Sequence, residues 1–180
     1  KQKKWKKEIG NLILNKKVGI FGLGRIGKAT AKLFQNLGAS IQGYDLYPDH
    51  EYLKNNDINL VSIEELFESS DIISVHVPGS KNNEPIINMS ELSLMKETAY
   101  LINVSRGGVV EEKALYRLLE KKKIAGAALD VFLEEPYDGD FLKLNNVILT
   151  PHLGSYALEG KLKMEIDAVN NLINFLNKIK

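Results

Sequence analysis

The stretch that most constrains the fold is a glycine-rich turn between an apolar run and a helical pattern. Residues 18–21 form a short apolar run of the kind seen in strands buried on both faces. The run leads into Gly-Leu-Gly-Arg-Ile-Gly at residues 22–27, which has the form G-x-G-x-x-G. A helical pattern follows and closes at Gly38, and a second apolar strand over Ser40–Tyr44 runs into Asp45. This order of strand, turn, helix, strand and acid predicts a dinucleotide-binding unit.

Each part of this unit has a physical role in holding a dinucleotide. Gly22 permits a tight turn, Gly24 lets the backbone approach the pyrophosphate, and Gly27 lets helix and strand pack closely. The phosphates are expected at the helix N-terminus, where free N–H groups favour negative charge. Asp45 lies 18 residues after Gly27, where a carboxylate can accept ribose hydroxyls and repel a 2′-phosphate. NAD is therefore predicted in preference to NADP, although a lone glycine motif could also be a tight turn that binds nothing.

Strands and helices alternate along the rest of the chain. Further strands are expected over residues 58–61, 71–77, 98–104, 126–132 and 147–149, and helices over 63–68, 91–95, 109–123 and about 156–179. This alternation predicts an α/β fold with a Rossmann-type, doubly wound parallel sheet in three αβα layers. Residues 46–55 contain Pro48 and are interpreted as a loop, and Ser90 is expected to cap the 91–95 helix.

The first helix is expected to bury one apolar face against the sheet. That face would consist of Ile26, Ala29, Thr30, Leu33, Phe34 and Leu37. The lysine-rich residues 1–9, which include Trp5, are interpreted as a solvated helix face anchored by the tryptophan.

Composition excludes several classes of function. The 180 residues contain 24 Lys and Arg against 23 Asp and Glu, so net charge favours neither a nucleic-acid nor a membrane partner. The absence of cysteine excludes disulfides, thiolate catalysis and a cysteine metal site, and is compatible with a reducing compartment. No apolar run approaches the length of a membrane span. We expect a cytoplasmic protein that uses no metal.

Polar residues follow the predicted strands and should gather at one edge of the sheet. They are Asp45, His76, Arg106, Asp130, Glu135 and His152. The guanidinium of Arg106 suits a carboxylate with an adjacent keto oxygen, and the imidazole of His152 can exchange a proton with a hydroxyl. A carboxylate such as Glu135 would orient that imidazole and stabilise its charged form. Taken singly, Arg106 could hold a loop, Glu135 could be a surface charge and His152 could cap a strand end. Together the three residues indicate a catalytic site.

Several linked motifs give the chain a resemblance to a known family. They are residues 22–27, His76-Val77-Pro78, Asn103-Val104-Ser105-Arg106-Gly107-Gly108, residues 126–132, Glu135-Pro136 and Thr150-Pro151-His152-Leu153-Gly154. Over essentially its whole length, the chain resembles the NAD-binding domain of the D-isomer-specific 2-hydroxyacid dehydrogenases. Within that family it looks most like the 3-phosphoglycerate dehydrogenases. Gly79-Ser80, Glu111 and the segment after His152 depart from the usual family pattern.

The resemblance implies roles for individual residues. Arg106 would bind the substrate, Glu135 would be the partner of the histidine, and His152 would be the acid–base. The cofactor-binding residues would be Gly22, Gly24, Arg25, Ile26, Gly27, Asp45, Val77, Pro78, Val104, Ser105, Arg106, Asp130, His152, Gly154 and Ser155. Among them, Arg25 and Ile26 would lie at the pyrophosphate, and Val77 beside the adenosine half.

The resemblance also implies a domain organisation. Residues 1–180 would be an NAD-binding domain without the family's separate substrate-binding domain, so turnover by this chain alone is expected to be poor. A homodimer through the Trp5 region is plausible, since the family pairs through this domain. Alternatives are a non-catalytic NAD-sensing module like the related corepressors, and a glyoxylate, hydroxypyruvate or D-lactate type of reductase. A domain for adenosylhomocysteine hydrolysis is disfavoured by the 103–108 and Glu-Pro motifs.

Overall fold

The computed structural model describes residues 9–80, 82 and 84–179, so the expectations for Trp5 and its neighbours lie outside the described residues. One parallel sheet of seven strands has the order β3-β2-β1-β4-β5-β6-β7. The strands are β1 (Lys17–Phe21), β2 (Ser40–Tyr44), β3 (Ile58–Leu60), β4 (Ile72–Val75), β5 (Tyr100–Asn103), β6 (Gly126–Leu129) and β7 (Val147–Leu149). The predicted Rossmann-type doubly wound sheet is confirmed.

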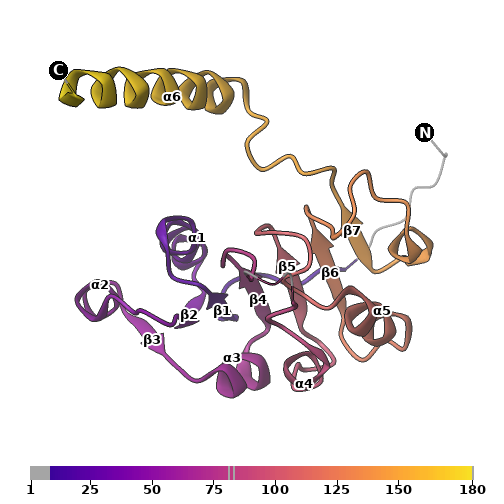
Figure 1. Ribbon diagram of the computed structural model, residues 1–180. Helices are drawn as coiled ribbons and strands as arrows, with labels where there is room; N and C mark the ends of the chain where they lie inside the picture. The colour runs from indigo at the N-terminus through magenta and orange to yellow at the C-terminus, as the bar shows by residue number, and fades with distance from the viewer. Residues whose placement is uncertain (1–8, 81, 83, 180) are drawn as a thin grey trace.

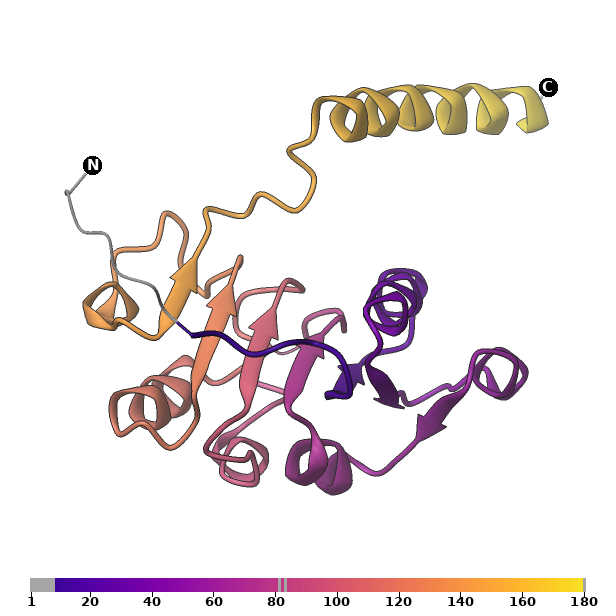
Figure 2. The ribbon, with the colours of Figure 1, turned by 180° about the vertical axis from the view of Figure 1, so that it is seen from behind.

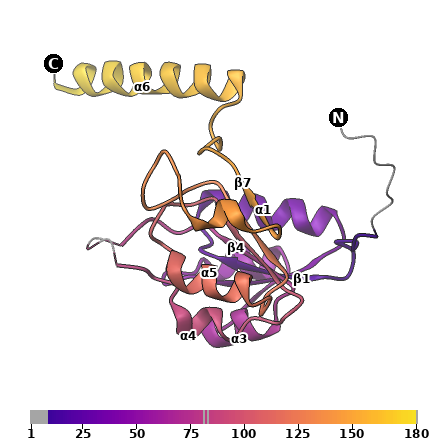
Figure 3. The ribbon, with the colours of Figure 1, turned by 90° about the vertical axis from the view of Figure 1, so that its right-hand side faces the viewer.

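Helices lie on both faces of the sheet (Figures 1 and 2). They are α1 (Arg25–Asn36), α2 (His50–Asn55), α3 (Ile63–Ser69), α4 (Met89–Leu92), α5 (Glu112–Glu120), a 3₁₀ turn over Asp140–Lys143, and α6 (Leu158–Ile179). The side view shows α3, α4 and α5 on one face and α1 on the other (Figure 3). Strand order reverses between β1 and β4, and ligands of doubly wound sheets bind at such a switch point.

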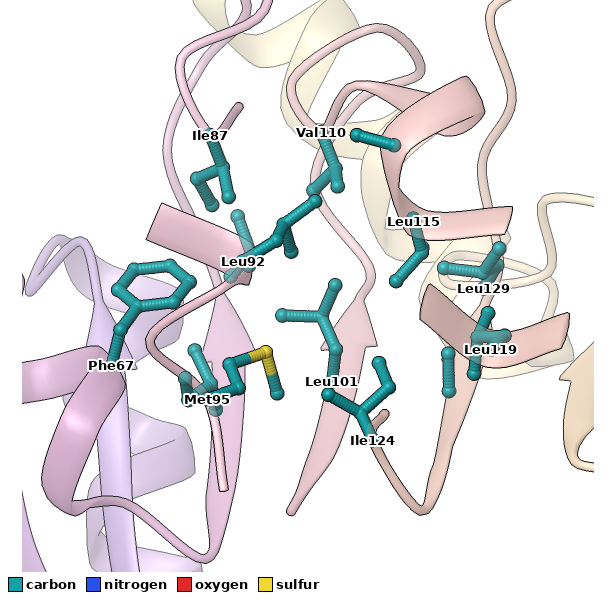
Figure 4. Packing of buried hydrophobic residues seen from close by; sticks show 14 of the residues in the cluster. Phe67, Ile87, Leu92, Met95, Leu101, Val110, Leu115, Leu119, Ile124 and Leu129 are labelled. Atoms are coloured by element: carbon teal, nitrogen blue, oxygen red, sulfur yellow. The ribbon is translucent and has the colours of Figure 1, made fainter. Parts of the chain in front are cut away.

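The main hydrophobic core lies between the sheet and helices α3, α4 and α5 (Figure 4). Phe67, Leu92, Leu101 and Leu115 are all less than 2% exposed there. A smaller cluster around Val18 packs the other half of the sheet against α1 and α2. Removing apolar surface from water is the main force that holds these layers together. The two clusters fix the strand ends that carry the polar residues.

The buried face of α1 differs from the prediction. The buried residues of this helix are Gly27 and Ala31, whereas Ile26, Leu33 and Leu37 are 69%, 65% and 57% exposed. The helix contacts the glycine turn through its smallest side chains, because an ideal Cβ on Gly27 would lie 1.9 Å from the Gly22 carbonyl oxygen. Close approach through small residues leaves Ile26, Leu33 and Leu37 exposed, whereas Phe34 of the predicted face does pack against the smaller core cluster.

Two predicted element boundaries were wrong. Residues 46–55 are not all loop, because Asp49 accepts a hydrogen bond from the Tyr52 N–H (3.1 Å) and starts α2 directly after it. Helix α4 starts at Met89, where the Glu91 carboxylate accepts from the Asn88 N–H (2.7 Å), so Ser90 does not cap it.

The helix expected from residue 109 begins only at Glu112, because Val110 forms a β-bridge with Ile87. The long C-terminal helix α6 is present, but every described side chain in it is exposed. It stands away from the sheet in all three ribbon views. Among the described residues, no helix is both long and apolar enough to cross a membrane.

Candidate active site

Glycine is found at three positions of the 22–27 turn for three different structural reasons. Gly22 has φ +99° and an ideal Cβ would lie 2.7 Å from the side chain of Val77, so another residue would be strained and crowded. Gly27 is required by the close packing of α1. Gly24 has φ −68°, and an ideal Cβ on it meets no atom of the described residues within 4 Å. The fold therefore does not require glycine at position 24, whereas a phosphate group approaching the backbone would.

Asp45 lies at the carboxyl end of β2 and contacts the glycine turn directly. Its Oδ2 accepts a hydrogen bond from the Leu23 N–H (2.6 Å), and its Oδ1 accepts from the Tyr47 N–H (2.8 Å). The carboxylate is thus held next to the turn, in the position where an adenosine ribose is expected in this type of fold. Ionised carboxylate oxygens have further acceptor sites, so these two bonds leave capacity for ribose hydroxyls.

Most of the predicted cofactor-binding residues line one hollow of about 400 Å³ at the switch point. Its lining residues are Gly24, Arg25, Ile26, His76, Val77, Pro78, Val104, Ser105 and Arg106. They come from the glycine turn and from the segments that follow β4 and β5. The structure thus brings together segments that the sequence placed at one edge of the sheet.

His76 was not predicted as a site residue, although it lines this hollow. Its Nε2 lies 2.8 Å from the hydroxyl of Ser74, which is a buried residue of β4. Burial lowers the pKa of His76, so the ring is neutral at pH 7. His76 is among the polar strand-end residues that the sequence placed at this edge of the sheet, but it was given no role in the site.

Glu135 and His152 form a direct pair on the segments that follow β6 and β7. His152 Nδ1 lies 2.9 Å from Glu135 Oε2, and Glu135 Oε1 accepts from the Phe132 N–H (3.0 Å). An ionised carboxylate only accepts hydrogen bonds, so Nδ1 carries the hydrogen and Nε2 is the nitrogen that can exchange a proton. The hydrogen bonds from His152 and from the Phe132 N–H lower the pKa of Glu135, which keeps the carboxylate ionised. The His152 side chain is 48% exposed and so is accessible to a substrate.

The pair borders an apolar hollow of about 550 Å³, lined further by Phe132, Tyr137, Leu142 and Leu149. Arg106 lines the other hollow, and its Nη1 donates a hydrogen bond to the Ser105 carbonyl oxygen (2.7 Å). The two segments touch through their backbones, because an ideal Cβ on Gly107 would lie 1.8 Å from the Phe132 carbonyl oxygen. The structure therefore joins Glu135 to His152 directly, and it links Arg106 to this pair through the contact between the Gly107 and Phe132 backbones.

Asp130 holds the turn that carries His152. Its Oδ1 accepts hydrogen bonds from the Thr150 hydroxyl and the Leu153 N–H (2.8 Å), and its Oδ2 accepts from the Gly154 N–H (3.0 Å). His152 has φ +54°, which is uncommon for a residue other than glycine and is stabilised by this anchored turn. Burial alone would raise the pKa of Asp130, but the Thr150 hydroxyl and the two N–H groups outweigh it and lower that pKa. Gly154 and Ser155 follow on the same exposed turn.

We expect Asp130→Asn to lower the free energy of unfolding by about 1–2 kcal/mol at pH 7, because the amide oxygen can keep the bonds from Thr150 and Leu153 while the amide nitrogen cannot accept the bond from the Gly154 N–H. A carboxyl whose folded pKa is lowered contributes stability above its ordinary pKa of about 3.9, and that stability is lost as pH falls through the folded value. The difference between wild type and variant should therefore shrink below pH 4. Urea unfolding at pH 7, 5 and 3.5 measures it, and a difference that does not change with pH would contradict this role of the carboxylate.

Comparison with known proteins identifies the family. The family model "D-isomer specific 2-hydroxyacid dehydrogenase, NAD binding domain" matches residues 1–154. The chain belongs to this family. The matching family model is that of an NAD-binding domain, in agreement with the glycine turn and Asp45. The resemblance carried by the linked motifs is confirmed at the level of the family.

Relatives and solved structures agree with this assignment. The chain is 41% identical over 169 residues to a glyoxylate reductase of Korarchaeum cryptofilum, covering 93% of the chain and 51% of that protein. It is 36% identical to a D-3-phosphoglycerate dehydrogenase of Synechocystis, covering 98% of the chain and 32% of that protein. The crystal structure of Aquifex aeolicus D-lactate dehydrogenase, complexed with NAD and lactic acid, has a TM-score of 0.86 at 30% identity, covering 97% of the chain and 58% of that protein. The chain thus spans about a third to a little over half of these three proteins.

Proposed function

We propose that this domain transfers hydride between NAD and the C2 atom of a small D-2-hydroxy acid or the corresponding 2-oxo acid. The observation that carries the proposal is the Glu135–His152 pair, with its 2.9 Å contact, its accessible imidazole and its ionised carboxylate. The nicotinamide, when bound, supplies or accepts the hydride. The residues of the chain bind and orient the acid and move the proton.

His152 Nε2 takes the hydroxyl proton when a hydroxy acid is oxidised and returns it when an oxo acid is reduced. Glu135 fixes the tautomer of His152 and stabilises the imidazolium that forms. The Arg106 guanidinium binds the substrate carboxylate, since its bond to the Ser105 carbonyl uses one of its five N–H donors and leaves the others for the acid. Asp130 holds the turn, and its side chain lies beside the place proposed for the nicotinamide.

The cofactor would lie along the hollow at the switch point. Its pyrophosphate would lie against Gly24, Arg25 and Ile26 at the N-terminus of α1, and its ribose hydroxyls against Asp45. Val77 and Pro78 would cover the adenosine half, and Val104 and Ser105 would lead toward the nicotinamide. The open space around Gly24 supports this placement.

The substrate is proposed within a narrow class. The sequence favoured 3-phosphoglycerate, whereas glyoxylate reductases of Korarchaeum cryptofilum and Thermococcus litoralis are 41% and 43% identical to the chain. We therefore propose a small 2-oxo acid, with glyoxylate and 3-phosphohydroxypyruvate as the two candidates. Selection between these two acids would come largely from a second, substrate-binding domain that is not part of residues 1–180. The homodimer stays a prediction.

The test is NADH oxidation by the full-length protein, measured with glyoxylate, pyruvate and 3-phosphohydroxypyruvate. Turnover of any of the three that is lost in Arg106→Ala supports the proposal, and the preferred acid identifies the substrate. If NADH binds but none of the acids turns over, the NAD-sensing alternative is favoured instead.

A further inference from the structure

The segment that carries Glu135 has little burial to hold it. Val131 and Phe132 are buried, but the next four residues, 133–136, are all exposed. Leu133 itself is 63% exposed. The position of the Glu135 carboxylate therefore depends on hydrogen bonds and backbone contacts rather than on packing of residues 133–136.

Glu112 supplies such a hydrogen bond from outside the segment. Its Oε1 accepts from the Leu133 N–H at 2.6 Å. Glu112 is the first residue of α5, which begins five residues after Gly107 and follows the β-bridge residue Val110. Together with the Gly107 backbone contact, Glu112 fastens residues 132–133 to the turn that carries Arg106 and Gly107. The Phe132 N–H in turn donates to Glu135, which holds His152.

The hydrogen bond does not need the charge of Glu112. Burial is the main cause that raises the pKa of Glu112, and the nearby charge of Glu134 raises it further, while the Leu133 N–H opposes both. A neutral amide with an oxygen in the same place can accept the same bond. Glutamine is therefore a fair replacement, and leucine is a replacement of similar size without an acceptor.

We propose that Glu112 is a positioning residue: through the Leu133 N–H it sets the place of Glu135, and so the orientation of the His152 imidazole. It also couples the Arg106 turn to the acid–base pair. This inference rests on the proposed function for its effect on turnover, whereas its effect on the Glu135–His152 geometry can be measured without a substrate.

The first measurement is the tautomer of His152, read from long-range proton–nitrogen NMR spectra of this chain, which contains only three histidines. Wild type and Glu112→Gln should show the hydrogen on Nδ1. Glu112→Leu should show a mixture of the two tautomers, because the carboxylate partner is displaced. Glu111→Leu, which removes the neighbouring charge at the same helix end, should resemble wild type. An unchanged His152 tautomer in Glu112→Leu overturns the proposal, whatever reaction the enzyme performs.

The second measurement is turnover of the full-length protein with the 2-oxo acid identified by the test of the proposed function. Glu112→Leu should lower kcat about tenfold with NADH affinity within about twofold of wild type, since small displacements of a proton-transfer group are costly. Glu112→Gln should restore kcat to within about twofold. Equal losses in Glu112→Gln and Glu112→Leu would mean that the charge matters rather than the hydrogen bond, and would overturn the proposal. If His152→Gln leaves kcat unchanged, the proposed function fails, and the tautomer experiment alone decides the role of Glu112.

Discussion

Replacement of Gly24 by alanine is expected to weaken NADH binding by about 100-fold while the chain stays folded. An alanine adopts φ −68° without strain, and its Cβ would meet none of the described residues within 4 Å. The free energy of unfolding should therefore change by no more than about 0.5 kcal/mol. The Cβ would instead occupy the space through which the pyrophosphate approaches the backbone. Calorimetric titration with NADH and urea unfolding of the same preparation measure the two effects.

Gly27→Ala provides the matched comparison. Its Cβ would lie 1.9 Å from the Gly22 carbonyl oxygen, so α1 or the turn must move. Overpacking of this kind costs about 1–3 kcal/mol, and NADH binding should weaken as well. The two alanines thus separate a glycine that the cofactor requires from one that the fold requires. Wild-type NADH affinity in Gly24→Ala would show that no phosphate lies against this turn.

His152→Gln is expected to lower kcat of the full-length protein for the 2-oxo acid by about 1,000-fold, with NADH affinity within about threefold of wild type. The reason is that glutamine cannot exchange a proton, and general acid–base catalysis contributes about 10²–10⁴-fold. Stopped-flow measurement of NADH oxidation gives kcat, and fluorescence titration gives the affinity. His50→Gln is the control, because His50 is an exposed residue at the start of α2.

Glu135→Gln separates proton transfer from orientation. An amide oxygen can still accept from Nδ1, but it cannot stabilise the imidazolium, so we expect a smaller loss of about 10–100-fold. The lowered pKa of Glu135 means that the wild-type carboxylate stays ionised even at mildly acidic pH.

A His152→Gln enzyme that keeps more than a tenth of the wild-type kcat would contradict the assignment of His152 as the acid–base.

The sequence predicted those parts of the fold that depend on local periodicity. The strands over 40–44 and 147–149 have the predicted bounds, and the Glu135–His152 pair followed from the order of the strand ends. The prediction of which α1 residues are buried was wrong for Ile26, Leu33 and Leu37. Two small residues, Gly27 and Ala31, decide how closely the helix approaches the sheet. Periodicity counts large apolar side chains and does not detect close contact through small ones.

Other features depend on contacts between distant segments. The hydrogen bond from the Leu133 N–H to Glu112 joins groups 21 residues apart, and a backbone donor leaves no pattern in the sequence. The pattern of α6 predicts a helix, but burial of its apolar side depends on a partner surface that periodicity does not specify. Likewise, Asp49 starts α2 directly after a proline-containing segment, because its carboxylate both caps the helix and pairs with Lys28 at 2.6 Å.

The placement of the adenosine ribose at Asp45 is tested most directly by calorimetric titration of this chain with NADH and with NADPH, for wild type and for Asp45→Asn. Asparagine keeps an oxygen for the glycine turn but removes the charge that would repel a 2′-phosphate. We expect wild type to bind NADH at least tenfold more tightly than NADPH, and the two affinities to come within about threefold of each other in Asp45→Asn. Equal binding of both cofactors by wild type, or discrimination that persists in Asp45→Asn, would contradict the placement of the adenosine ribose at Asp45.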